Sequence, residues 1–180
     1  MACITKLAGG FGYDCDTGAT GLLSAMIINK EDIVSFTVAA GGAPVITGIS
    51  LAAGASIYKI DTPKRSLVIS ESLKINEGAP NAFKHSAVLV PTSVNSDGMM
   101  KQIASLTNGS FVILCRRDPN AFPRIYGLYY GMSATSIERS THDNGGWFTI
   151  NMETPDQFIG EDGLVITGAA YDSLYASAVY

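Results

Sequence analysis

The chain alternates short hydrophobic runs with clusters of Gly, Pro, Asn and Asp. Short runs bounded by turn formers are typical of an antiparallel all-β protein. The pattern predicts two pairs of strands, the second joined through Ala52, Ala53 and Gly54, then a long hairpin and further strands. These are expected at 22–28, 33–38, 45–51, 55–62, 66–75, 83–91, 110–117, 123–141, 146–153 and 163–170.

One segment has the period of a helix instead. In SDGMMKQIASLT, residues 96–107, the apolar side chains recur at spacings of three and four and share one side of a helix. They are Met99, Met100, Ile103 and Leu106. The sequence therefore predicts a single domain, 1–180, that is all-β, mainly antiparallel and flanked by one helix. It also predicts an N-terminal arm at about 1–20 and a C-terminal tail at about 170–180.

The expected strand SLVISESLKI, residues 66–75, has two unlike faces, because successive side chains point to opposite sides. The mostly apolar face carries Leu67, Ile69, Glu71, Leu73 and Ile75. The small polar face carries Ser66, Val68, Ser70, Ser72 and Lys74. The expected partner strand repeats this, with Lys84, Ser86, Val88 and Val90 on its second face. Because the apolar face should pack, we expect Leu73→Asp to abolish folding.

A long hairpin with a smooth polar face has edges that expose backbone N–H and C=O groups, which invite pairing with another chain. Pairing with identical neighbours around a ring removes every edge. The polar face would then line a water-filled bore, together with residues 127–137. The alternative is an ordinary β-sandwich whose outer face is rich in serine, and the pattern alone does not separate the two.

Composition narrows the classes of function. The 180 residues are 47% hydrophobic and 16% charged, whereas a soluble protein usually holds about 25% charged residues, so partners should cover part of the surface. A net charge of −4 argues against binding the nucleic-acid backbone as the main task. Three cysteines without a C-x-x-C pair indicate neither a disulfide framework nor a zinc site. No leader or membrane-spanning stretch is visible, so synthesis in the cytoplasm is expected.

Residues that could carry chemistry are scattered. His85 lies on a predicted strand and His142 in a predicted turn, and neither has a nucleophile nearby in sequence. The GGFG at 9–12 lacks the spacing of a dinucleotide site, and the arginines of CRRDPNAFPR, 115–124, are expected to form an ion-pair cluster or a contact between subunits. We therefore expect no enzyme, cofactor or metal. A different class stays open, a β-sandwich that binds a glycan or peptide on Tyr126, Tyr129, Tyr130 and Trp147.

Several segments, taken in order, resemble the tail tube proteins of tailed bacteriophages, especially those of phages of gut Bacteroidales bacteria. They are MACITKLAGGFGYDC, SLVISESLKINEGAPNAFKHSAVLV, DGMMKQIASLTNGSFVILCRR, RIYGLYYGMSATS and FTINMETPDQ, which span roughly the whole chain. The resemblance is loose, since CRRDPNAFPR is basic and rich in proline where the family would have an acidic strand. A neck, baseplate or connector protein of the same virion therefore stays open.

The resemblance implies a tail-tube-like β-barrel or sandwich with a long hairpin, assembled as hexameric rings that stack into a hollow tube and conduct DNA during ejection. The lumen would be lined by Ser66, Val68, Ser70, Ser72, Lys74, Lys84 and Ser86. Stacked rings would meet at Gly41, Gly42, Ala43, Ala53 and Gly54. The implied partners are other copies of the chain, the terminator, baseplate or tape-measure proteins of the tail, and viral DNA that passes without specific binding. The implied location is the virion tail.

Overall fold

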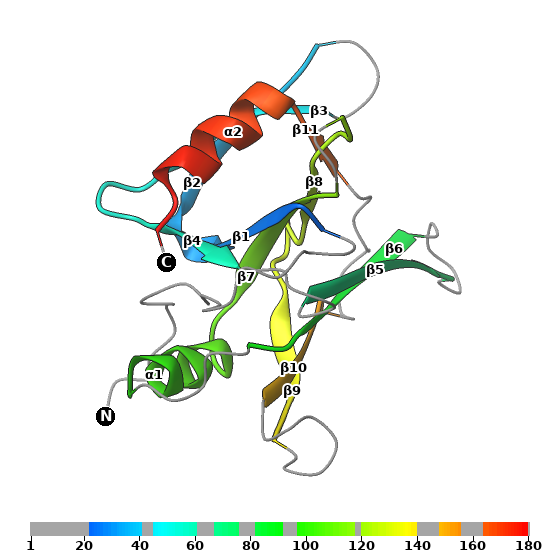
Figure 1. The fold of residues 1–180 in the computed structure, drawn as a ribbon. Coiled ribbons are helices and arrows are strands. Elements are labelled where there is room, and N and C mark those ends of the chain that lie inside the picture. Colours follow the sequence, from blue (N-terminus) through cyan, green and yellow to red (C-terminus); the bar gives the residue numbers. More distant parts are fainter. Residues whose placement is uncertain are drawn as a thin grey trace.

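A computed structural model describes residues 22–40, 45–60, 67–75, 82–91, 97–117, 120–139, 148–155 and 164–179 (Figure 1). Its elements are β1 (Ser24–Asn29), the 3-10 turn η1 (Lys30–Asp32), β2 (Ile33–Val38), β3 (Val45–Leu51), β4 (Ile57–Ile60), β5 (Leu67–Lys74), β6 (Ala82–Leu89), α1 (Asp97–Leu106), β7 (Phe111–Arg116), β8 (Arg124–Tyr126), β9 (Ser133–Arg139), β10 (Phe148–Glu153), β11 (Leu164–Ile166) and α2 (Gly168–Ser177).

The strands form two sheets. Sheet A has the order β2-β3-β11-β8-β7-β1-β4, and sheet B has the order β5-β6-β10-β9. Every pair of neighbouring strands is antiparallel except β3 with β11. This confirms the expected all-β, mainly antiparallel class with α1 as a flanking helix. The described strands do not close into a barrel, because both sheets keep two edge strands.

The first four strands pair differently from the expectation. β3 and β4 are not hydrogen-bonded to each other; β2 pairs with β3, and β1 pairs with β4. Ile33 lies opposite Leu51 in the first pair, and Ile28 lies opposite Ile57 in the second. The four strands are therefore one long antiparallel ribbon with a corner at η1 and at the turn that follows β3. Since the two halves of this ribbon form opposite ends of sheet A, the sheet has to curl.

The central strands of sheet A are buried on both faces, as the continuous apolar run of β7 predicts. In β1, Ala25 and Ile27 face sheet B, whereas Met26 and Ile28 face α2. The residues of β7 divide in the same alternating way. The described chain thus has three layers, which are sheet B, sheet A and α2, with one apolar core on each side of sheet A (Figure 1).

The segment expected as a C-terminal tail forms α2. Thr167 begins the helix, and its side chain accepts a hydrogen bond from the N–H of Ala170 at 3.4 Å. The helix packs on the concave side of sheet A through residues at helical spacing. They are Tyr171, Leu174, Tyr175 and Ala178. After the helix, Val179 pairs with Tyr58, so the end of the described chain covers the outer edge of β4.

Arg116 joins α2 to the middle of sheet A. Its guanidinium donates a hydrogen bond to Asp172 at 2.8 Å and lies 4.7 Å from the centre of the Tyr171 ring. The Tyr171 hydroxyl lies 2.8 Å from the hydroxyl of Ser24 on β1. These contacts hold α2 over β1 and β7, although both strands lie far from the helix in sequence.

The stretch 127–131 is a turn rather than part of a strand. Gly127 and Gly131 have φ of 75° and 73°, which a strand does not allow, and the N–H of Gly131 donates to the carbonyl of Gly127 at 2.8 Å. Met132 then pairs with Phe111, and β9 begins at Ser133. Of the expected segment 127–137, only the residues from Ser133 onward therefore belong to sheet B.

Three buried acidic groups predict how the stability depends on alkaline pH. Burial raises the pKa of Cys115 and of Tyr126 to about 12, and it also raises the pKa of Tyr171. Above about pH 9 the unfolded chain releases these protons while the folded chain keeps them, so the unfolded chain binds fewer protons and the free energy of unfolding falls as pH rises. Below pH 8 these groups contribute no slope.

In urea unfolding, we expect the contribution of these groups to the free energy of unfolding to stay constant up to about pH 8. Between about pH 9 and 12 the free energy of unfolding should fall steeply. Each group contributes at most about 1.4 kcal/mol per pH unit. Tyr171→Phe should flatten the loss by up to one such contribution. A free energy of unfolding that is the same at pH 8 and pH 11 would contradict the burial of these groups.

Candidate assembly surface

The hairpin of β5 and β6 has the register that the alternation of its residues predicts. Leu67 lies opposite Leu89, Ser70 opposite Ser86, and Ser72 opposite Lys84. On the inner face, Leu67, His85, Ala87 and Leu89 are buried against sheet A. The two unlike faces predicted from sequence are therefore present, and the small polar groups lie on the side of sheet B away from the core.

The inner face packs along only half of β5. Leu67 is 5% exposed, but Leu73 is 56% exposed and Ile75 is 75% exposed. The far end of the hairpin extends beyond sheet A, so its inward-pointing side chains have no second layer there among the described residues. The exposure of Leu73 removes the reason to expect that Leu73→Asp abolishes folding, because a period of two specifies a face but not how far the opposite sheet reaches.

The outer face of sheet B is a network of small polar side chains that extends over all four strands. The hydroxyls of Ser70 and Ser86 lie 2.7 Å apart, and the side-chain amide of Asn151 donates to Ser136 at 2.7 Å. Lys84 and Glu153 form an ion pair at 2.8 Å. The described face is thus polar: the charges of Lys84 and Glu153 offset each other, and Glu138 adds an exposed carboxylate on the same side.

Five of the seven residues predicted for the lumen lie on this outer face. They are Val68, Ser70, Ser72, Lys84 and Ser86. Ser66 and the side chain of Lys74 lie outside the described residues. The contribution of β9 and β10 was not predicted, although the alternation in FTINME, which places Thr149, Asn151 and Glu153 on one side, could have indicated it.

Two of the five residues predicted for contact between rings lie in the described part of the chain. Ala53 and Gly54 lie in an exposed turn after β3, where Gly54 has φ of 81°. Gly41, Gly42 and Ala43 lie outside the described residues, in the connection that precedes β3.

The aromatic residues proposed as a ligand platform are divided between the interior and the surface. Tyr126 is buried, and its ring meets that of His85 edge to face at 5.1 Å. Tyr129 and Tyr130 are exposed in the 127–131 turn, and Trp147 lies outside the described residues. His85 accepts a hydrogen bond at Nδ1 from the N–H of Gly127 at 3.3 Å, so it is a core residue that fixes this turn.

The described residues hold no group of three or more His, Cys, Asp or Glu side chains placed to bind a metal. No protein-family model, curated protein or solved structure matches the chain. Within the described part, no helix is long and apolar enough to cross a membrane.

The directions of the two edge strands of sheet B determine how one copy could pair with another. β5 and β9 are the edge strands, and each pairs with one described strand only. Because the sheet has four strands and all its pairs are antiparallel, β5 and β9 run in opposite directions. A second copy placed beside the first by a rotation would therefore present its β9 antiparallel to β5, with both polar faces on the same side.

Proposed function

We propose that this chain is a structural, non-catalytic virion protein of the tail tube type, whose copies join into rings through sheet B. The carrying observation is the antiparallel sheet with two oppositely directed edges and one continuous small polar face. Pairing of β9 with β5 of the next copy is a head-to-tail contact, which closes into a ring when the rotation closes. Closure removes exposed edges that would otherwise invite aggregation.

In this ring the polar face of sheet B lines the bore, while sheet A and α2 lie on the outer side. Among the described side chains of this wall, the serines and Asn151 are neutral and Lys84 is paired with Glu153, so the described part offers DNA no unpaired cation. The net charge of −4 adds a weak repulsion of phosphate. These properties suit a tube through which DNA slides, and the tail, after synthesis in the host cytoplasm, is the proposed location. Stacking of rings through residues 41–43 and 53–54 is part of the same proposal.

The pairing of edges is tested by crosslinking between copies. We would replace Cys3 and Cys15 by serine and introduce Ser72→Cys on β5 with Ser136→Cys on β9. Within one copy these positions lie on strands three spacings apart, so they are separated by at least roughly 14 Å, which is too far for a disulfide. Oxidation should therefore give a ladder of covalent oligomers that ends at the ring size.

Two controls make this result specific. Ser72→Cys combined with Ala176→Cys, on the exposed side of α2, should give no ladder. Negative-stain images of the unmodified protein should show rings with a hollow centre. Single subunits in every salt and concentration, together with no ladder, would contradict the proposal. The register between β5 of one copy and β9 of the next is not fixed by the sheet of a single copy. Ser70→Cys is therefore tested with Ser136→Cys as well as Ser72→Cys.

The lining of the bore is tested by its charge. Ser70→Lys with Ser72→Lys adds two cations per copy to the polar face while changing the free energy of unfolding by no more than about 0.5 kcal/mol per exposed site. Assembled particles of this variant should retain labelled duplex DNA at low salt and release it at high salt. The unmodified particles should not retain it. Equal retention by both would place these serines outside the bore.

A further inference from the structure

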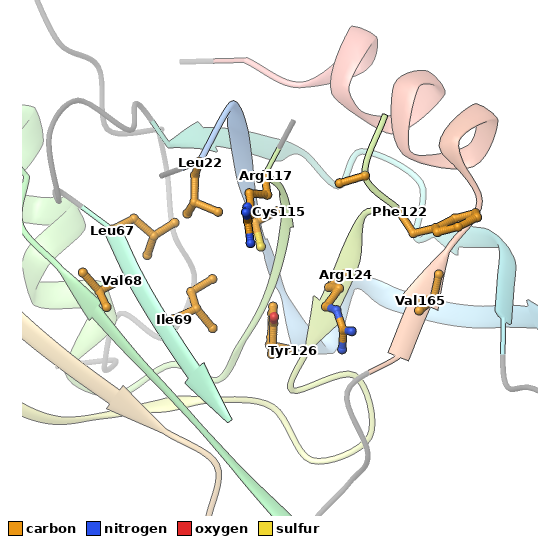
Figure 2. A pocket seen from close by; sticks show the side chains of 11 residues that line it. Leu22, Leu67, Val68, Ile69, Cys115, Arg117, Phe122, Arg124, Tyr126 and Val165 are labelled. Carbon is orange, nitrogen blue, oxygen red and sulfur yellow. The ribbon is translucent and has the colours of Figure 1, made fainter. Parts of the chain in front are cut away.

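A groove opens between the two sheets at the beginning of β5. Its volume is about 720 Å³, which lies in the range of ligand pockets. Leu67 and Ile69 of β5 form one side, and Cys115 and Tyr126 of sheet A form the other (Figure 2). Phe122, which is 76% exposed, adds a large apolar side chain at the mouth. An opening of this kind exposes apolar surface of the core between the sheets, which favours an occupant.

The polar groups of the groove are mainly cationic. Arg117 and Arg124 both line it, and both are exposed at its rim. The facing carboxylate is that of Glu71, whose Oε2 lies 3.8 Å from Nη1 of Arg124. Arg116, the third arginine of this stretch, points away to Asp172 and α2. Among the described residues, two arginines and one carboxylate lie at this groove, which favours an occupant that carries both apolar and acidic side chains.

The sequence that leads into the groove has this composition. Leu22 lines the groove and is the first described residue, so residues 1–21 are joined to the described structure at the groove itself. Within them, GGFGYDCD at 9–16 combines two aromatic residues with two aspartates. Asp16 is six residues from Leu22, a reach of roughly 20 Å in an extended chain, so the segment can return to the rim.

The spacing within this segment also fits the groove. In an extended chain Phe11 and Tyr13 point to one side, and Asp14 and Asp16 point to the other. The aromatic rings would meet the apolar walls while the carboxylates remain at the rim beside the arginines. The segment 156–163 has similar residues and is joined at both ends, to β10 and to β11, so it is the alternative occupant that the test has to distinguish.

We propose that residues 9–16 of the chain bind in this groove of the same copy. Phe11 and Tyr13 fill the apolar part, and Asp14 and Asp16 pair with Arg117 and Arg124. The bound segment covers Leu67–Ile69 and leaves Ser70–Lys74 for pairing with a neighbouring copy. Because every residue of the groove belongs to one copy, this binding does not depend on the formation of rings.

The test is hydrogen–deuterium exchange of the full-length chain at a concentration where sedimentation shows single subunits. Amides of residues 9–16 should exchange at least about tenfold more slowly than an unstructured peptide, which corresponds to about 1.4 kcal/mol. Arg117→Glu with Arg124→Glu should remove this protection. Adding Asp14→Lys and Asp16→Lys to that variant should restore it. Arg139→Glu, on β9, is the matched control and should leave the protection unchanged.

Circular dichroism and urea unfolding establish that each variant is folded, since both groove arginines are exposed. Exchange of 9–16 at the unstructured rate in the unmodified chain would overturn the proposal. Protection that survives the double arginine variant would also overturn it, as would protection that maps to 156–163 instead. Protection that disappears on dilution would show that a second copy supplies the segment, which contradicts binding within one copy.

Discussion

We expect the replacement of Leu89 by aspartate to unfold the isolated subunit. Leu89 is 1% exposed, lies opposite Leu67 of β5 and Ile150 of β10, and belongs to the core between the sheets. Removing a buried leucine side chain costs about 2–5 kcal/mol, and a buried carboxylate without a partner costs several more. The total approaches or exceeds the roughly 5–15 kcal/mol that stabilises a typical protein. Unfolding would be seen as the loss of the far-UV circular dichroism signal and of the cooperative transition in urea.

The matched control is the same substitution at Leu73, on the same face of the same hairpin. Because that side chain is 56% exposed, Leu73→Asp should change the free energy of unfolding by less than about 1 kcal/mol. Both variants are compared at a concentration where only single subunits are present. If Leu73→Asp unfolds the subunit as Leu89→Asp does, the far end of β5 is packed in the monomer, and the overhang described above is wrong.

The contrast between these two leucines shows what a residue pattern can specify. Alternation along 66–75 and 83–91 assigned the faces correctly, since a strand allows only two directions for its side chains. The extent of packing depends on the length of sheet A and on the angle at which the sheets cross, and neither is encoded in the hairpin. For this reason the two-faced character was predictable and the exposure of Leu73 was not.

The pairing of strands was less predictable than their existence. β2 pairs with β3 because their connection is short. β1 pairs with β4 only because both chains of the ribbon bend at the same point, one at η1 and the other at the turn after β3. The sequence has turn-forming residues at both corners, but it does not show that the two paired segments bend together and stay paired. α2 carried a readable signal, since Tyr171, Leu174, Tyr175 and Ala178 follow helical spacing. Short polar residues between them obscured it.

For the assembly surface, sequence could indicate the serine-rich face but not its full width. Asn151 and Ser136 are fifteen residues apart and come together only because β10 lies between β6 and β9. The opposed directions of β5 and β9, on which ring closure depends, follow from the number and order of strands in sheet B. Such a property belongs to the topology and cannot be inferred from any one segment.

Replacing Gly131 by alanine should destabilise the protein by about 3 kcal/mol, from two separate causes. With φ of 73° the residue lies in the left-handed region, where a side chain costs about 1–2 kcal/mol. An added Cβ would also collide with the Ser110 hydroxyl. The turn cannot easily yield, because Met132 is held to Phe111 by two backbone hydrogen bonds of 2.7 and 2.9 Å.

Gly54 separates these causes, because it has a similar φ of 81° but open space around its Cα. Gly54→Ala should therefore cost only the backbone part, about 1 kcal/mol. Gly131→Ala in a Ser110→Ala background should recover about 1–2 kcal/mol, as expected for residues in contact. Urea unfolding of the four variants gives these differences. If the two Gly131 measurements are equal, the collision contributes nothing, and the turn at 127–131 is held by backbone conformation alone.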